Sequence, residues 1–255
     1  MIAKNQLAKL AEAKKLTLKN AEKDYLQELI LFNLYREVGN KLVFKGGTAL
    51  YKTQGLNRFS EDLDFTQMAR RLDIQSILLK ILRSLTFLGI EGKIKEFKEF
   101  SNELNVRLTF KGPLYTGNPN SLAFISLNIS KRERVLSDVD KVLIVTNYPE
   151  IVSFEVFTMN CEEILAEKIR AILSRDKARD VYDLWFLLKK GVKLNQNLIL
   201  RKLKKKDIEF TTKLLFKEID LKKQQWNADL KPFIIGELPK FESVFIELRQ
   251  KLSFS

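Results

Sequence analysis

The stretch LVFKGGTALYKTQGLNRFSEDLDF, residues 42–65, constrains the fold of this chain more than any other. It begins with three apolar residues, which is typical of a short buried strand. Gly46 and Gly47 follow, and without a Cβ they let the backbone turn sharply and approach a ligand. Thr48 then opens a predicted short helix that ends near Gly55. The free N–H groups at a helix N-terminus favour an anion, so this turn is predicted to bind phosphate.

The second half of the same stretch alternates between polar and apolar residues. Residues two apart in a strand share a face, so four polar side chains are expected to lie together: Arg58, Ser60, Asp62 and Asp64. Two carboxylates at this spacing project side by side, and Mg²⁺ binds such carboxylates together with phosphate oxygens and water. We therefore interpret Asp62 and Asp64 as metal ligands, with Arg58 and Ser60 near a phosphate. The alternative is an edge strand with solvated charges after an ordinary glycine turn.

A second block, residues 158–191, reads as two helices. In the first, Lys168 falls inside the apolar stripe, whereas Glu163, Glu167 and Arg170 occupy the opposite side, which we expect to be solvated. A lysine on a buried face has to meet a negative charge. Lys168 is thus predicted to meet either a nucleotide's phosphates or, in the structural alternative, a protein carboxylate or the surface.

The second helix of this block carries two aspartates, Asp180 and Asp183, three residues apart on the flank of its apolar stripe. Salt bridges to neighbouring basic residues are one explanation for the pair. By spacing from Lys168 we favour Asp183 as a site residue, with Asp180 a close second.

Composition excludes several classes of enzyme. The chain has no histidine and a single cysteine, Cys161, which removes Ser-His-Asp hydrolases, Cys-His proteases, His-ligated zinc enzymes and disulfide frameworks. Carboxylates, lysine, arginine and hydroxyl groups remain, and metal-assisted phosphate chemistry needs no more. The first residues lack an apolar signal core, and no run of about 18 apolar residues occurs, so we expect a cytoplasmic protein without a membrane span.

The formal net charge of +13 favours a polyanionic partner, most often nucleic acid. A run of basic residues contributes to it: Arg201, Lys202, Lys204, Lys205 and Lys206. This run is either a groove for an RNA backbone or an ordinary solvated face, and a generally lysine-rich proteome would also explain the charge.

The remaining pattern predicts an α+β fold that ends in a helical C-terminal region. Helices are expected at residues 18–38 and 72–90, strands at 93–97, 105–110, 122–129 and 153–157, and helices again over 192–255. We expect two domains, residues 1–157 and residues 158–255.

Four segments together resemble a known family: FKGGTAL at residues 44–50, RFSEDLDF at 58–65, EILAEK at 163–168 and KARDVYDL at 177–184. They are similar to motifs of the AbiEii/AbiGii (MenT-like) nucleotidyltransferase toxins, which belong to the polymerase-β-like nucleotidyltransferase superfamily. The resemblance implies a nucleotidyltransferase-type mixed sheet flanked by helices. It also implies transfer of a nucleoside monophosphate from an NTP, with release of pyrophosphate. It also implies a toxin of a toxin–antitoxin or abortive-infection system, acting on RNA (tRNA) and restrained by a cognate antitoxin.

On this reading each candidate residue has an expected role. Asp62 and Asp64 are expected to hold two Mg²⁺ ions. Lys168, together with Asp183 or Asp180, is expected to complete the catalytic group. The nucleotide-binding set comprises Gly46, Gly47, Thr48, Arg58, Ser60 and Lys168. Ser60, beside the metal, is also a candidate for self-modification.

One position departs from the superfamily pattern. A third carboxylate often stands on the strand beside the Asp-x-Asp pair, and the best-placed residue here is Asn128, which cannot act as a base. Three explanations are open: the strand register differs, the third acid comes from elsewhere in the chain, or the enzyme uses two carboxylates.

Two other functions compete with RNA modification. One is the same chemistry on a small molecule or a protein, and the other is that of a non-catalytic nucleic-acid-binding protein of the same fold.

Overall fold

The computed structural model describes residues 1–204 and 210–253, which form two compact units. Unit 1 comprises Met1–Gly55, Phe59–Val135 and Val139–Thr158. Unit 2 comprises Leu56–Arg58, Leu136–Asp138 and Met159–Ser255, so two three-residue segments that lie between parts of unit 1 in the sequence belong to it.

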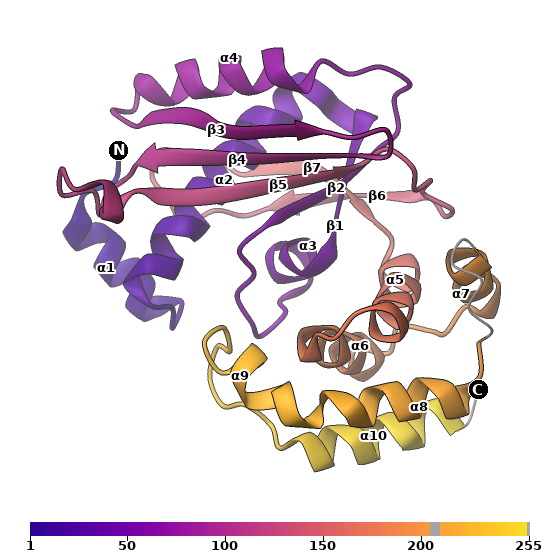
Figure 1. Cartoon of the computed structure of the whole chain (residues 1–255). Helices are drawn as coiled ribbons and strands as arrows, with labels where there is room; N and C mark the ends of the chain where they lie inside the picture. The colour runs from indigo at the N-terminus through magenta and orange to yellow at the C-terminus, as the bar shows by residue number, and fades with distance from the viewer. Residues whose placement is uncertain (205–209, 254–255) are drawn as a thin grey trace. The chain divides into compact units, whose positions relative to one another are not determined.

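Unit 1 contains a seven-stranded mixed sheet with the strand order β3-β4-β5-β2-β1-β7-β6 (Figure 1). Its strands are β1 (Leu42–Lys45), β2 (Leu63–Gln67), β3 (Glu91–Glu99), β4 (Glu103–Lys111), β5 (Ala123–Ser130), β6 (Val139–Ile144) and β7 (Phe154–Met159). β2 runs antiparallel to β1 and parallel to β5, while β1 and β7 are parallel. β3, β4 and β5 form an antiparallel meander. The mixed sheet of the predicted α+β fold is thereby confirmed.

The helices of unit 1 are α1 (Lys4–Ala13), α2 (Leu18–Val38), α3 (Gly46–Gln54) and α4 (Ile74–Thr86). In Figure 1, α2 passes behind β3, β4 and β5, and α4 lies beside β3. The apolar side chains of β4 and β5 point to this side and join the core with Tyr25 and Leu29 of α2 and Leu78 and Leu85 of α4. Alternation then places the polar side chains of these strands on the other face of the sheet.

The expected elements at residues 18–38, 72–90, 93–97, 105–110, 122–129 and 153–157 all occur, with ends that differ by a few residues. Two elements went unpredicted, α1 and the edge strand β6. The prediction that one strand carries Arg58, Ser60, Asp62 and Asp64 is wrong, because β2 begins at Leu63. The preceding residues form an irregular loop in which alternation does not define a face.

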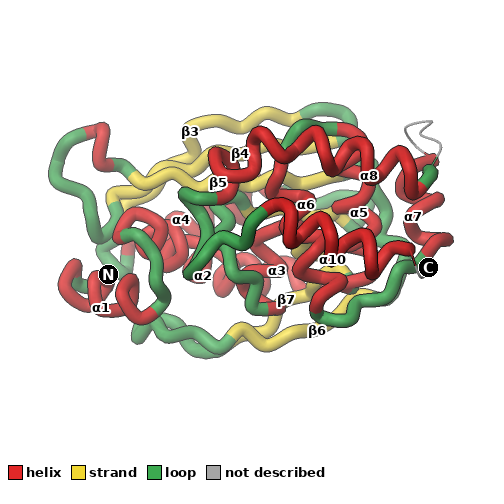
Figure 2. The backbone as a smooth tube through the Cα atoms, turned by 90° about the horizontal axis from the view of Figure 1, so that it is seen from below, coloured by secondary structure: helices red, strands yellow, loops and turns green. Residues whose placement is uncertain are grey.

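In its described part, unit 2 is helical apart from connecting loops, as the red segments after β7 in Figure 2 show. Its helices are α5 (Cys161–Ser174), α6 (Ala178–Lys189), α7 (Gln196–Leu203), α8 (Thr212–Leu221), α9 (Trp226–Leu230) and α10 (Phe241–Ser253). Trp226 and Phe241 are buried as expected, whereas Phe233 and Phe245 are half-buried. No helix in the described ranges is both long and apolar enough to cross a membrane.

Lys202 of α7 changes two expectations for unit 2. Its ammonium lies 2.6 Å from a carboxylate oxygen of Glu163 and 2.8 Å from one of Glu167. All three residues are buried, so the expected solvated side of α5 is covered by α7. Lys202 therefore drops out of the basic run; Lys204 is exposed, and Lys205 and Lys206 lie outside the described residues.

Candidate active site

Gly46, the first residue of α3, approaches Asp64 of β2 more closely than another residue could. Its φ is +77°, and a Cβ at this position would lie 2.6 Å from Oδ2 of Asp64. Only glycine combines that backbone angle with that contact. The residue before it, Lys45, occupies the N-cap position and makes no side-chain cap. The start of α3, where a helix favours anions, thus adjoins a carboxylate.

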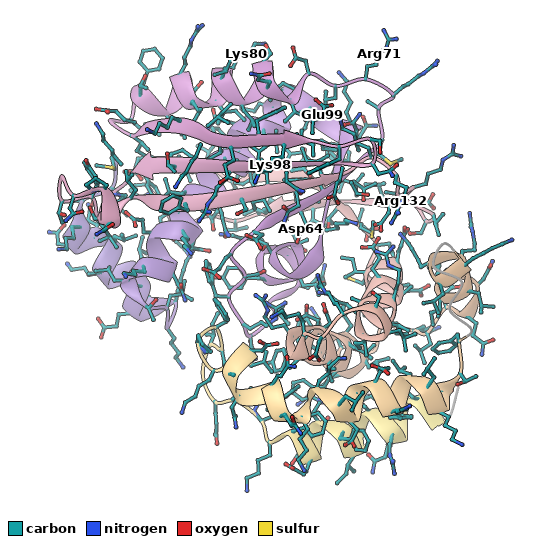
Figure 3. The ribbon with its side chains drawn as sticks, viewed as in Figure 1. Asp64, Arg71, Lys80, Lys98, Glu99 and Arg132 are labelled. Atoms are coloured by element: carbon teal, nitrogen blue, oxygen red, sulfur yellow. The ribbon has the colours of Figure 1, made fainter. Side chains whose placement is uncertain are left out.

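Asp64 belongs to a polar row that crosses five strands. Its Cα partners are Lys45 on β1 and Asn128 on β5. The row continues through Asn105 on β4 to Lys98 on β3. Directly opposite residues in a sheet share a face, so these five side chains stand on the polar side of the sheet. Figure 3 labels two members of the row, Asp64 and Lys98.

Asn128 stands where the superfamily pattern places a third carboxylate, in register with Asp64 on the neighbouring parallel strand. Its Nδ2 donates a hydrogen bond of 3.0 Å to Oδ1 of Asp64. The amide thus orients Asp64 and leaves its Oδ2 on the side of Gly46. Register shift is excluded as an explanation for the missing acid.

Replacing Asn128 with aspartate is therefore expected to make stability depend on a divalent cation. Two carboxylates in register repel each other, and the hydrogen bond between positions 64 and 128 is lost. In EDTA, Asn128→Asp should therefore lower the unfolding free energy by about 1–3 kcal/mol and lower the melting temperature with it. Mg²⁺ should recover more stability in the variant than in the wild type, because a third carboxylate adds a ligand. Thermal unfolding with EDTA and with Mg²⁺ measures both; an equal Mg²⁺ response would contradict a metal beside Asp64.

The loop before β2 is held by buried polar contacts. Gln27 of α2 donates from Nε2 to the carbonyls of Ser60 and Glu61, each at 2.9 Å. Lys23, one turn earlier, pairs with the Glu61 carboxylate. The hydroxyl of Thr48, which is buried in α3, donates to the carbonyl of Asp62. These bonds fix the backbone of the segment, in which Ser60 is buried and the Asp62 side chain is exposed.

Lys45, the β1 neighbour of Asp64, is a cation that the sequence analysis did not single out. Its Nζ lies 2.7 Å from Oε2 of Glu133, which follows β5, and both side chains are 11 % exposed. Both residues belong to unit 1, together with Gly46 and Asp64. The lysine stands inside the FKGGTAL segment, so the signal for it was present in the motif itself.

The other predicted residues form a buried ion cluster within unit 2. Nζ of Lys168 lies 2.6 Å from Oδ2 of Asp183 and 3.0 Å from Oδ1 of Asp180. Burial by itself lowers the pKa of a lysine, but Asp183 and then Asp180 hold the pKa of Lys168 above its usual value. Lys168 is thus held in its charged form, and it contacts both Asp183, which the sequence analysis favours, and Asp180, its second candidate.

Two arginines complete this cluster. Arg58 binds Asp183 with two nitrogens, at 2.7 Å and 2.6 Å, and Arg175 binds Asp180 with two, at 2.7 Å and 2.8 Å. Burial raises the pKa of a carboxyl, but the neighbouring cations outweigh it and hold the pKa values of Asp180 and Asp183 below their usual range. Arg175 was not predicted as a cluster member. Three cations face two carboxylates, which leaves a charge of +1.

The predicted residues therefore fall into two sets, each described within its own unit. Unit 1 holds Gly46, Gly47, Thr48, Ser60, Asp62 and Asp64, and unit 2 holds Arg58, Lys168, Asp180 and Asp183. The roles of all of them in nucleotide binding and catalysis stay predictions.

The likeness to solved structures covers nearly the whole chain. JHP933 from Helicobacter pylori is 24 % identical, covering 94 % of this chain and 92 % of its own, with a TM-score of 0.64. MenT4, a nucleotidyltransferase toxin from Mycobacterium tuberculosis, is 16 % identical, covering 100 % of this chain and 89 % of its own, with a TM-score of 0.66. At these identities the likeness establishes a shared fold. No curated protein sequence matches the chain.

A family model goes further than the fold. The model described as nucleotidyl transferase AbiEii toxin, Type IV TA system, matches residues 30–247 of the 255-residue chain. The match includes both glycines before Thr48, both aspartates around Leu63 and the whole of the ion cluster. It confirms the resemblance seen in the four motifs, and the chain belongs to the AbiEii family of nucleotidyltransferase toxins of type IV toxin–antitoxin systems.

Proposed function

We propose that this nucleotidyltransferase moves a nucleoside monophosphate from an NTP to a hydroxyl of an RNA, a tRNA in the cell, and that it does so with Mg²⁺. One observation carries the proposal: Gly46 brings the start of α3 against the Asp64 carboxylate. A phosphate on the N–H groups of Gly46, Gly47 and Thr48 would therefore adjoin a metal-binding oxygen.

The residues around Asp64 fit a divalent cation. Oδ2 of Asp64 occupies the space that a Cβ of Gly46 would fill, and Asp62 two residues earlier is exposed. Within the described ranges no group of three or more Asp, Glu or Cys side chains is arranged to hold an ion. Substrate phosphate oxygens and water would complete the coordination, as Mg²⁺ prefers. When bound, Mg²⁺ ions at Asp62 and Asp64 supply charge stabilisation and activation of the attacking hydroxyl.

The transfer itself exchanges a phosphoanhydride bond of the NTP for a phosphodiester bond to the acceptor. The acceptor oxygen forms a bond to the α-phosphorus, the bond from that phosphorus to the bridging oxygen breaks, and pyrophosphate leaves with the electron pair. The acceptor hydroxyl releases its proton to water. We assign no general base, since Asn128 replaces the nearest candidate. Lys168, in a cluster with a net charge of +1, is assigned to stabilise the negative charge that develops on the phosphates.

The net charge of +13 favours a polyanionic acceptor over a small molecule. Membership in a type IV toxin–antitoxin family further supports a cognate antitoxin as the partner that limits the activity. The test is incubation with each labelled NTP, Mg²⁺ and total RNA, followed by separation of labelled products. Label in RNA supports the proposal, whereas label only in a small molecule or a protein would redirect it to that acceptor.

Replacing Lys168 with methionine separates chemistry from packing. Without Lys168, Asp183 keeps Arg58 and Asp180 keeps Arg175, so Lys168→Met should stay within about 1 kcal/mol of wild-type stability. Transfer should fall on the order of 10²–10³-fold, the scale for removing one preorganised charge-stabilising donor. Turnover and thermal unfolding are to be measured on the same preparations.

Lys168→Arg is the matched control for this change because it preserves the charge. It should recover little activity, since a planar guanidinium does not replace a compact ammonium in a confined site. A stable and fully active Lys168→Met protein would remove Lys168 from the catalytic group.

A further inference from the structure

The polar face of β3, β4 and β5 extends the row that contains Asp64. Residues that alternate with the core side chains occupy it, among them Lys93, Lys95, Lys98, Asn105, Arg107, Lys111, Phe124 and Ser126, together with the acidic residues Glu91, Glu96 and Glu103. Their cross-strand partners tie them together, with Lys98 opposite Asn105 and Arg107 opposite Ser126. We call this surface the sheet platform. All of it belongs to unit 1, as Asp64 does.

An aromatic ring with two cations stands on this platform. Arg107 lies with its guanidinium carbon 4.8 Å from the centre of the Phe124 ring, and Lys95 lies with its Nζ 5.0 Å from it. Lys95 reaches the ring because β3 has an irregularity between Ile94 and Glu96 that adds a residue to the strand. Phe124 is half-buried, and both cations are exposed. An apolar core needs no phenylalanine here, on the face opposite α2 and α4.

The charge of the platform is positive although acidic residues share it. Five cations, Lys93, Lys95, Lys98, Arg107 and Lys111, stand beside the three carboxylates of Glu91, Glu96 and Glu103. Glu96 pairs with Lys98 at 3.1 Å, and Glu91 pairs with Lys111. Lys95 and Arg107 flank Phe124 and interact with the Glu96 carboxylate through its charge, while Glu96 makes its hydrogen-bonded pair with Lys98, so the cations beside the ring are the ones placed for an external anion.

We propose that the sheet platform binds the single-stranded end of the RNA acceptor, with a base on Phe124 and phosphates on Lys95 and Arg107. The inference rests on the proposed function, because it names where that acceptor lies. Bases of single-stranded RNA stack on aromatic rings and arginine planes, and lysine and arginine hold the phosphates between them. Exposed sheet faces with aromatic residues provide both contacts at once.

The distance from the platform to Asp64 suits this assignment. Phe124 precedes Asn128 by four residues on β5, and Asn128 is in register with Asp64. Four residues of a strand span about 13 Å. An RNA end that stacks on Phe124 and runs along β5 would therefore bring its terminal hydroxyl, a few nucleotides further on, to the row of Asp64.

The experiment measures binding of a short single-stranded RNA to the full-length protein without NTP or Mg²⁺, so that no turnover is required. Lys95→Glu combined with Arg107→Glu should lower affinity and reduce the slope of log affinity against log salt by about 0.7 for each lost phosphate contact. The matched control reverses Lys80 and Arg83 on α4, which are exposed away from the platform and change the net charge equally. Equal losses in both double variants would overturn the platform.

Phe124 tests the stacking contact separately. Phe124→Leu keeps an apolar side chain on the sheet but removes the ring, and should weaken RNA binding by about 5- to 150-fold. Phe124→Tyr keeps the ring and should bind RNA with wild-type affinity, and equal melting temperatures of the two variants exclude misfolding as the cause of the loss. Wild-type affinity in Phe124→Leu would overturn the base contact.

Labelling of RNA by the wild type distinguishes this inference from the proposed function. If the platform variants bind RNA normally while the wild type labels it, the platform is wrong and the function stands. If binding maps to the platform but the wild type labels no RNA, the RNA acceptor is wrong and the binding surface stands.

Discussion

Asp64→Asn is expected to abolish nucleotidyl transfer, with a rate loss on the order of 10³ or more, because it removes a ligand charge worth several kcal/mol in the transition state. The volume stays the same, and an asparagine oxygen can still accept the hydrogen bond from Asn128. The fold should therefore survive. Single-turnover rates with labelled NTP measure the loss. Asp62→Asn should behave in the same way.

Ligand-induced stabilisation provides the control for this variant. Mg²⁺ with NTP should raise the melting temperature of the wild type and leave that of Asp64→Asn nearly unchanged, because only a bound ligand stabilises the folded state. Glu99→Gln removes an equivalent charge from the exposed end of β3 and should respond like the wild type. Equal stabilisation of Asp64→Asn and wild type by Mg²⁺ with NTP would contradict the assignment of Asp64 as a metal ligand.

Asp183→Asn is expected to cost about 3–5 kcal/mol of unfolding free energy, the largest stability effect among the residues of the candidate site. Asp183 is fully buried and carries a bidentate bond from Arg58 in addition to the contact with Lys168. Its neutralisation leaves both cations buried with less compensation. Asp180→Asn should cost less, because Arg175 is largely exposed and Lys168 would keep Asp183. Urea unfolding of the three proteins measures the ranking.

The pH dependence identifies the cause of that loss. The pKa of Asp183 is lowered in the folded state, so its stabilisation is present above the unfolded value of about 3.9 and disappears as pH falls through the folded pKa. The difference between wild type and Asp183→Asn should therefore be constant near neutral pH and shrink only in acid, below about pH 4. A difference that does not change between neutral pH and acid would assign the loss to packing rather than charge. Asp220→Asn, on the exposed side of α8, should differ from wild type by no more than about 0.5 kcal/mol.

The elements around the motifs followed from local pattern. Apolar periodicity located α2 and the meander strands, and the glycine pair located the start of α3, because these features are decided within one element. The loop at residues 58–62 was misjudged as strand. Its conformation is set by Gln27, a buried side chain some thirty residues earlier, and no local pattern reports such a contact.

The ion cluster shows the same limit from another side. The stripe argument placed Lys168 on a buried face and required a negative partner, and Asp180 and Asp183 are those partners. It failed for Glu163 and Glu167, since one helix taken alone cannot reveal that α7 covers its other side with Lys202. The separate argument from strand alternation failed for Arg58, which it assigned to a strand although the Arg58 side chain is paired with α6.

The registers in which the strands of the sheet pair could not be predicted from the sequence. Asn128 was identified as a departure from the pattern, but only strand pairing places it opposite Asp64. Lys45 and Glu133 are far apart in the chain and had no reason to be considered together. Long-range pairing of this kind depends on the packing of the whole core rather than on any segment.

Residues 56–58 and 136–138 belong to unit 2 although they lie between parts of unit 1 in the sequence. This limits where the chain of this toxin can be split into fragments or joined to a part of another toxin. A fragment that ends before α5 would retain Arg58 but lack its partner Asp183. It would also leave the backbone N–H groups of Leu136 and Ser137 without the Glu163 carboxylate to which they donate. An exchange of C-terminal regions between toxins would meet the same mismatch. A split at one peptide bond therefore yields no self-sufficient half, and fragment complementation would require both pieces to fold together.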